Sequence, residues 1–570
     1  MKPWLWSSIL LLLFAAHASA QHHTMVDEEL PPFNATGEEP MSYALFPDNK
    51  GYFYMHVGFM VLAFWVLMPI GIMFGIARSS LHIPTQILAF GVAMLGFFFG
   101  QMYGHSVPHL YAGNVHHSMG WILFLFMIAQ LFVGVVRKIS KVVGRNQESQ
   151  YNRLETVHLM NRPSSSSSDD HHHDHHSEAS SAETLNNFYD ENDHDHDNDS
   201  FGKQHLAPSD EELLDEDPIT MAYEKPPLYM RAFNAVSPYI PNFMKKFVVV
   251  LAYNSIICRY IHLVLGRTFI VLIFIQTLSG LVVYHGVCRS WDVLGCIAHL
   301  IKGGIFFFYG MMTLGRYLGA FAERGWAWNR VDGGSRFSFE MIESGLIFTY
   351  GITNTWMEHF GQDSAWTHKD LEHASLAFMW WWCGLAGILV ESRALRRLLE
   401  RSVMNTPLDV PKHEPHQTYS LNPFPALTVL MTGISMGNHH QDSQYSTNVH
   451  YMWGLLLSLA ACCRFITYIS LYRKSPKGTQ PTRPPSELLG AFLLIAGSIL
   501  FMASNSGTLT WLRRNQVDSM FMMNVCVALT SMTMCYVTGL MIIKAWSKKR
   551  EDRKTAHLRK NHANNNIAIA

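Results

Sequence analysis

Two apolar stretches of the chain carry the same polar pattern. One runs as HHSMGWILFLFMIAQLFVG from His116 to Gly134, and the other runs as HLVLGRTFIVLIFIQTLSG from His262 to Gly280. In both, the histidine is followed by Gly four residues later, by Gln fourteen later and by Gly eighteen later. Because each residue of an α-helix advances about 100°, these positions all fall within about 40° of the histidine. The spacing therefore predicts a narrow polar face on an otherwise apolar helix.

Two further stretches show related patterns. One has the same offsets and carries His82, Gln86, Gly96 and Gly100. The other begins at His56, but its Gly71 and Gly75 lie one position out of register, so it is the weaker member of the set. A single histidine of this kind could cap a helix, and a single glycine could mark close helix packing. Four together indicate a flat, bulky group between helices, and haem suits this because neutral imidazole is a good axial ligand and glycine leaves room for a porphyrin.

The composition indicates that these helices belong to a membrane protein. Of 570 residues, 49% are hydrophobic and only 15% are charged, which is too little charge for the surface of a soluble domain of this size. Runs of about 20 apolar residues can span a bilayer, and the sequence has about eleven of them: 52–77, 82–103, 116–136, 262–286, 292–315, 341–357, 373–392, 424–438, 449–471, 487–503 and 519–543. The run at 424–438 is short, so the number of spans is ten or eleven. We expect an all-α polytopic membrane protein with an N-terminal four-helix bundle and a C-terminal seven-helix module.

The segments outside the spans differ in composition. Residues 1–20 are typical of a cleavable secretory signal, with a short signal anchor as the alternative. Residues 21–51 then form a lumenal tail with a glycosylation acceptor at Asn34. Residues 139–246 are rich in Ser, His and Asp and predict a disordered loop. Its His/Asp tracts are candidates for binding zinc or copper, and a solvated spacer with at most weak metal affinity is the alternative.

Basic residues predict the orientation, because short cytoplasmic loops are enriched in Lys and Arg. They place the N-terminus in the lumen, and the 139–246 loop and the 547–570 tail in the cytosol, of a protein of the secretory or endomembrane system or of the plasma membrane. This orientation puts His56 and His116 at the lumenal side and His82 and His262 at the cytosolic side. We therefore expect two bis-histidine haem sites, one above the other.

The stretches around these four histidines, 52–138 and 247–286, resemble the four-helix core of b561-type transmembrane cytochromes, which carry two b haems and often take electrons from ascorbate. The resemblance departs from the family at the long insertion and at the doublet His116–His117. The two-part chain also resembles the fungal Ytp family of membrane proteins, in stretches such as HLIKGGIFFFYGMMTLGRYLGAF and NHHQDSQYSTNVHYMWGLL. That resemblance implies a Ytp-like membrane module at 287–546 and no particular activity.

Carboxylates and imidazoles recur at the predicted lumenal ends of the C-terminal spans. These candidate ligands for zinc, copper or iron are Glu358, His359, Glu372, His373, His439, His440 and His450. Helix capping and hydrogen bonding are the alternative for the same residues. Glu343, His299 and Lys302 lie inside predicted spans, where they form an ion pair or line a path for protons or metal. Cys288 and Cys296 lie near the lumenal border and could form a disulfide.

Three functions remain open at this point. The first is an oxidoreductase in which two b haems carry electrons across the bilayer to a lumenal acceptor, with a small-molecule donor such as ascorbate. The second is divalent metal transport or metal handling in the secretory pathway. The third is a non-catalytic membrane protein. Nucleic-acid binding is not expected, because the basic residues are loop anchors and form no patch.

Overall fold

The apolar runs form long helices. A computed structural model of the chain describes residues 42–134, 136, 255–289, 292–328, 337–357, 365–395, 398–399, 421–439, 441, 443–473 and 483–569. All regular structure in these ranges is helical. Two compact units are distinguished, Met1–Met127 with Gly266–Ala570 and Ile128–Leu265. The predicted signal at 1–20, Asn34 and the 139–246 loop lie outside the described residues.

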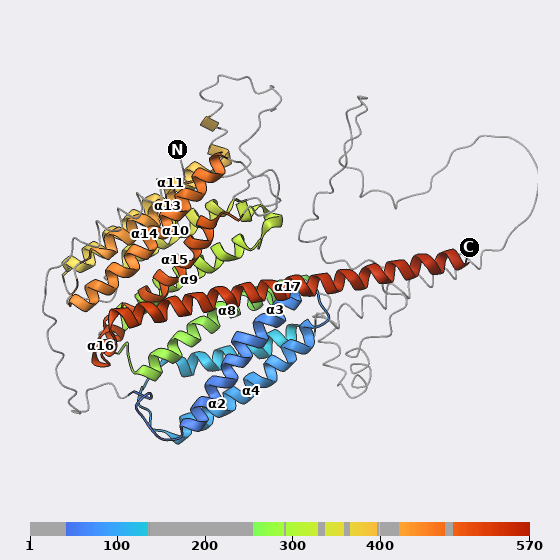
Figure 1. Cartoon of the computed structure of the whole chain (residues 1–570). Helices are drawn as coiled ribbons and strands as arrows, with labels where there is room; N and C mark the ends of the chain where they lie inside the picture. Colours follow the sequence, from blue (N-terminus) through green and yellow to red (C-terminus); the bar gives the residue numbers. More distant parts are fainter. Residues whose placement is uncertain are drawn as a thin grey trace, which may run out of the picture. The chain divides into compact units, whose positions relative to one another are not determined.

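The N-terminal helices agree with the first four predicted spans. They are α2 (Lys50–Val61), the π-helix η1 (Leu62–Leu67), α3 (Met68–Ile76), α4 (His82–Ser106), an unlabelled helix Val115–Gly134, and α8 (Ser255–His285) (Figure 1). The first three follow one another without interruption and form a single long rod. Helix α4 packs against α2, η1 and α3, so His56 and His82 lie on two packed neighbours.

The C-terminal helices are α9 (Val293–Tyr317), α10 (Phe339–Met357), α11 (His368–Glu391), α13 (Phe424–Gly437), α14 (Gln444–Arg473), α15 (Pro485–Ala503), α16 (Ser506–Arg514) and α17 (Ser519–Ile569). Helix α15 packs against both α9 and α14, α14 also packs against α13, and α10 packs against α11. An aromatic core fills this module, in which Trp453 stacks on Phe501 with ring centres 4.1 Å apart. Neither Trp453 nor its neighbour Leu457 has any exposed surface.

Within the described residues, nine helices are long and apolar enough to cross a membrane. They correspond to nine of the eleven predicted runs. The other two runs are also helical, but α13 is shorter than a full span and α10, which contains Glu340 and Glu343, is not among the nine. Many large apolar side chains remain exposed on these helices, such as Leu95 and Phe98 of α4, as lipid-facing surfaces require. The all-α polytopic membrane fold is therefore confirmed.

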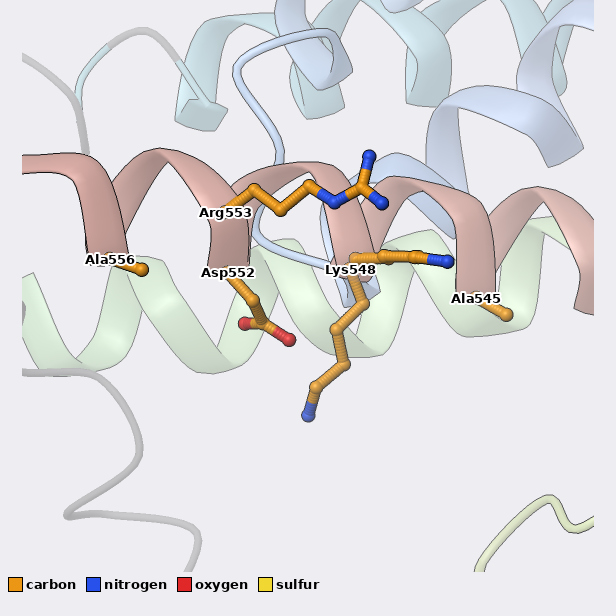
Figure 2. A pocket seen from close by; sticks show the side chains of 6 residues that line it. Ala545, Lys548, Asp552, Arg553 and Ala556 are labelled. Atoms are coloured by element: carbon orange, nitrogen blue, oxygen red, sulfur yellow. The ribbon is translucent and has the colours of Figure 1, made fainter.

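Helix α17 continues well past its apolar part. It runs from Ser519 to Ile569 without a break, through the 547–570 segment that was predicted only as a tail, and is the long red helix of Figure 1. The side chains of Lys548, Asp552 and Arg553 line a shallow pocket along its charged part (Figure 2). Nearby, the Ser79 hydroxyl in the turn between α3 and α4 donates to Glu551 at 2.9 Å. The α3–α4 turn therefore lies beside the charged C-terminal part of α17.

The predicted link between Cys288 and Cys296 is present as a disulfide at the junction of α8 and α9. Between the two cysteines, Asp292 accepts hydrogen bonds from the Ser506 hydroxyl and from the Gly507 amide, the latter at 3.0 Å. The junction is thereby fastened to the first turn of α16.

Candidate functional site

His56 of α2 is held against a glycine-lined face of α4. Its Nδ1 lies 2.8 Å from the carbonyl oxygen of Gly96. The ring also covers Gly100, where an added Cβ atom would lie only 2.5 Å from Nδ1. Because ordinary carbon contacts are about 3.5–4.0 Å, no residue larger than glycine fits there without displacing the imidazole. The two glycines that share a face with His82 thus serve as the seat for His56.

His82 of α4 makes the same contacts in the opposite direction. Its Nδ1 lies 2.7 Å from the carbonyl oxygen of Gly71, and a Cβ atom at Gly75 would lie 2.9 Å from that nitrogen. The Gln86 amide also donates to the Met68 carbonyl at 3.3 Å. Each of the two helices therefore seats the histidine of the other.

The π-helix η1 explains why the glycines of the first span are out of register. It occupies Leu62–Leu67, between His56 and Gly71. A single π-turn accommodates one extra residue within a helix. The spacings of fifteen and nineteen residues from His56 to Gly71 and Gly75 thus become equivalent to the fourteen and eighteen of the other stretches. The register offset of Gly71 and Gly75, which made this span the weaker member, is thereby removed, although the fourth residue after His56 is Met60 where the other stretches have Gly or Gln.

The third and fourth stretches repeat the arrangement. His116 Nδ1 lies 3.2 Å from the carbonyl oxygen of Gln276, whose side-chain amide donates back to the His116 carbonyl at 2.9 Å. The ring covers Gly280, where a Cβ atom would lie 3.0 Å from Cε1. Within the second unit, the Gln130 amide donates to the His262 carbonyl at 2.9 Å, and the His262 ring covers Gly134. The repeated His, Gln and Gly pattern is therefore a set of reciprocal contacts between neighbouring helices.

The hydrogen bonds to carbonyl oxygens determine which ring nitrogen carries the proton. A carbonyl can only accept, so Nδ1 of His56 and His82 must be the donor. Nδ1 of His116 lies 3.2 Å from the Gln276 carbonyl oxygen and 3.1 Å from the Ser279 hydroxyl. The neutral imidazole then keeps its lone pair on Nε2. A backbone carbonyl on the second ring nitrogen is the usual outer partner of a metal-bound histidine, because it fixes both the tautomer and the ring orientation.

His56 and His116 face each other across the first unit. Their ring centres are 6.4 Å apart and the rings are inclined at 88°. A metal–imidazole bond is about 2 Å long and the ring centre lies roughly 1 Å behind the nitrogen, so two rings on opposite sides of one metal atom have centres about 6 Å apart. At this separation, the two imidazoles would fit as the residues that hold one haem. His82 and His262 belong to different units, and their pairing stays a prediction.

The neighbouring His117 lies in a different environment from His116. It is exposed, and its backbone amide donates to the Asn114 side chain at 3.1 Å at the start of the helix. Its side chain has no glycine seat of the kind found at His116. Of the doublet, His116 is the residue with the geometry of a ligand.

Some of the candidate metal ligands of the C-terminal module lie together. Glu372 of α11 contacts His439 at the end of α13, with Oε2 and Nδ1 2.5 Å apart, and contacts His368 at 3.2 Å. The ring centre of His373 lies 5.0 Å from that of His439. Among the described residues, no three His, Cys, Asp or Glu side chains form a group suited to a metal ion. Glu358, His359 and His440 lie outside the described residues, so metal binding at this end stays a prediction.

His450 of α14 lies beside His299 of α9. Its ring centre is 6.1 Å from that of His299 of α9, and its Nδ1 lies 2.8 Å from the Ser446 carbonyl oxygen. His299 makes the equivalent bond to Gly295 of its own helix at 2.8 Å. At the start of α11, which carries Glu372 and His373, Asp370 forms a capping box with Thr367.

The fold and these helix faces define a polytopic helical membrane protein, and the comparisons identify its family. Residues 272–545 match the family described as protein YTP1-like, C-terminal, and residues 37–140 match a domain of unknown function. The uncharacterized membrane protein C3B8.06 of Schizosaccharomyces pombe is 33% identical over 547 residues, covering 91% of this chain and 99% of that protein. The chain belongs to the YTP1-like family of membrane proteins.

Two proteins of Saccharomyces cerevisiae are also similar. The uncharacterized membrane protein YCR061W is 29% identical over 542 residues, which cover 89% of this chain and 84% of that protein. Protein YTP1 is 26% identical over 246 residues, which cover 43% of this chain and 46% of that protein. The expected Ytp resemblance is thereby confirmed, and the protein is an integral membrane protein.

Proposed function

We propose that the N-terminal helices hold two b-type haems and carry electrons across the membrane, as in the b561-type cytochromes that they resemble. His56 and His116 would be the axial ligands of the lumenal haem, and His82 and His262 those of the cytosolic haem. A bound b haem supplies one-electron transfer. The donor would be a small molecule such as ascorbate, and the acceptor would lie on the lumenal side.

The observation that carries the proposal is the facing of His56 and His116. Two imidazoles whose ring centres are 6.4 Å apart leave the distance that one metal atom requires. The Nδ1 atoms of both are directed to backbone carbonyls, at 2.8 and 3.2 Å. With Nδ1 occupied in this way, Nε2 is the ring nitrogen of each histidine that would bind a metal.

The separation of the two seats also favours a path across the membrane. His56 sits near the start of the first rod, and Gly75, which contacts His82, lies 19 residues further along it. At 1.5 Å per residue these positions are roughly 28 Å apart along the helix axis, close to the thickness of the hydrocarbon core of a bilayer, about 30 Å. Sites at the two ends would therefore lie near the two membrane surfaces.

Absorption spectroscopy of the purified full-length protein tests the proposal. We expect the dithionite-reduced spectrum of two b-type haems. His56→Ala and His116→Ala should each remove the same half of the signal, because a bis-histidine site fails when either ligand is lost. His82→Ala and His262→Ala should remove the other half.

His117→Ala is the matched control, since it changes the neighbouring histidine and should leave the spectrum intact. The electron-transfer function is refuted if the wild-type protein shows no Soret band even when haem is supplied during expression. The histidine faces would then be helix-packing surfaces.

Metal handling is a second candidate, favoured by the contact of Glu372 with His439 and the adjacent ring of His373. Carboxylate and imidazole together suit zinc, copper or iron. His439→Ala should then weaken zinc binding by the purified protein while leaving any haem spectrum unchanged. Equal zinc binding by wild type and variant would return these residues to a structural role.

A further inference from the structure

Five charged side chains are buried together among the apolar helices of the C-terminal module. This buried charge cluster comprises Arg316 of α9, Glu340 and Glu343 of α10, Arg464 of α14 and Glu487 of α15. None is more than 7% exposed, and Glu340 is fully buried. Only Glu343 was singled out by its position in the sequence. The cluster is separate from the histidines of the proposed haem sites.

Arg464 is shared by all three carboxylates. Its Nη1 donates to both oxygens of Glu487, at 2.9 and 2.8 Å. Its Nη2 donates to Glu340 Oε1 at 3.3 Å and lies 3.6 Å from Glu343 Oε1. The bidentate pair with Glu487 is thus the strong one. The carboxylates of Glu340 and Glu343 both approach Nη2 of Arg464, and neither forms a short hydrogen bond with it.

Arg316 compensates only in part. Its Nη1 lies 3.9 Å from Glu343 Oε1, while its Nε donates to the Trp326 carbonyl at 2.7 Å and its guanidinium lies over the Phe339 ring. Glu340 Oε2 is buried and accepts no hydrogen bond, and at Glu343 the neighbouring donor is the neutral phenol of Tyr309 rather than a cation. Neither carboxylate therefore has the charged donors that an ionised carboxylate needs when it is buried.

The charges of the cluster do not balance. Three carboxylates face two guanidinium groups. Among the described residues, the other polar groups that face them add no positive charge: Tyr309 and Tyr468 are phenols, and Glu391 lies outside these ion pairs and accepts from Ser338 at 2.6 Å. An unpaired charge inside a low-dielectric interior is strongly unfavourable. Two carboxylates this close cannot both ionise easily, and one proton between them restores the balance.

We propose that Glu340 and Glu343 together form a proton-binding site of the C-terminal module. A hydronium ion of the aqueous phase transfers its proton to one carboxylate oxygen of the pair: one O–H bond of hydronium breaks, one O–H bond forms on the carboxyl group, and a water molecule is left. The resulting hydroxyl then donates to a neighbouring carboxylate oxygen. Beside Arg464 and Glu487, a small cavity bordered by Tyr309 and Ser486 has room for about one water molecule. Such a water is the means by which the proton can enter and leave.

The site would give the module a group that gains and loses one proton within the membrane. Ionisable groups in this position usually mark a path for protons or ions. Helix α10 carries both carboxylates, so protonation changes the charge with which α10 is attracted to Arg464 of α14. The module could thereby couple proton uptake to a change in the contact between these two helices.

Infrared spectroscopy of the full-length protein in lipid nanodiscs at neutral pH tests the inference. The wild type should show the carbonyl band of one protonated carboxylic acid per chain. Glu340→Gln and Glu343→Gln should each abolish it, because two carboxylates then face two guanidinium groups and no proton is required. Glu487→Gln should abolish it for the same reason, and provides a third variant if one of the others fails to fold.

Glu323→Gln is the matched control, because Glu323 is exposed and outside the cluster; it should leave the band unchanged. A wild type without the band, or a band that persists in a folded Glu340→Gln or Glu343→Gln variant, would overturn the shared proton site. The outcome is independent of the electron-transfer proposal, since none of these variants touches the histidines and the band requires no haem.

Discussion

The contact between the His56 ring and Gly100 can be tested by a substitution that adds one methyl group. In the substitution Gly100→Ala, the new Cβ atom would lie 2.5 Å from His56 Nδ1 and 2.9 Å from Cε1. Carbon contacts are about 3.5–4.0 Å, so the ring must retreat by about 1 Å. The ring has little freedom to do so, because Nδ1 is bonded to the Gly96 carbonyl at 2.8 Å and the centre of the His116 ring lies only 6.4 Å away.

The cost of this substitution has two parts. Overpacking costs about 1–3 kcal/mol, and loss of the hydrogen bond to Gly96 costs about 1 kcal/mol more. We therefore expect Gly100→Ala to lower the free energy of unfolding by about 2–4 kcal/mol. We also expect it to lower the haem content, because the Nε2 atom of His56 moves with the ring.

Gly104→Ala is the control, one helical turn further along α4. Nothing lies within 4 Å of its Cβ position, so alanine should be neutral or stabilising by up to about 1 kcal/mol through helix propensity. Chemical unfolding in detergent and the Soret absorbance of both variants provide the measurement. If Gly100→Ala and Gly104→Ala unfold at the same denaturant concentration and bind equal haem, the glycine is not a seat for the histidine.

Three further outcomes are expected. Gln276→Leu removes the bond to the His116 carbonyl and should cost about 1 kcal/mol in unfolding experiments, whereas an unchanged stability would mean that the pair is not formed. Cys288→Ser should destabilise the protein by about 2 kcal/mol, because the disulfide closes only a short loop, and reductant should then have no additional effect on the variant. Protease added to sealed vesicles should cut within 139–246 from the cytosolic side; a protected segment would reverse the assumed orientation and with it the proposed haem sides.

The helices were predictable because their signal is local. A run of apolar residues long enough to span a bilayer must be helical, since lipid offers no partner for backbone polar groups. The eleven predicted runs are all helical for this reason. The polar faces were predictable in the same way, because the angle between residues depends only on the helix. The disulfide between Cys288 and Cys296 was predictable as well, because the two cysteines are close in the sequence and both lie near the predicted lumenal border.

The contacts between helices were not predictable from these patterns. The sequence alone assigned His56 to a weaker position, because nothing in its residues revealed that η1 would take up one extra residue and restore the register. It also did not indicate that Gly96 and Gly100 serve the histidine of another helix. Register across a helix pair depends on how side chains of both helices interdigitate, and one chain segment contains only half of that information.

The sequence by itself determined which segments cross the membrane and which residues share a face, because helix geometry converts spacing into direction. The tertiary structure decided which faces meet. It brought His56 to within reach of His116. It also directed three carboxylates to Arg464, of which Glu340 and Glu487 lie 124 and 23 residues away along the chain. Buried charges lose their solvation and must find compensation in whatever the fold places beside them. Their chemistry is therefore set by packing between distant segments, which no local pattern records.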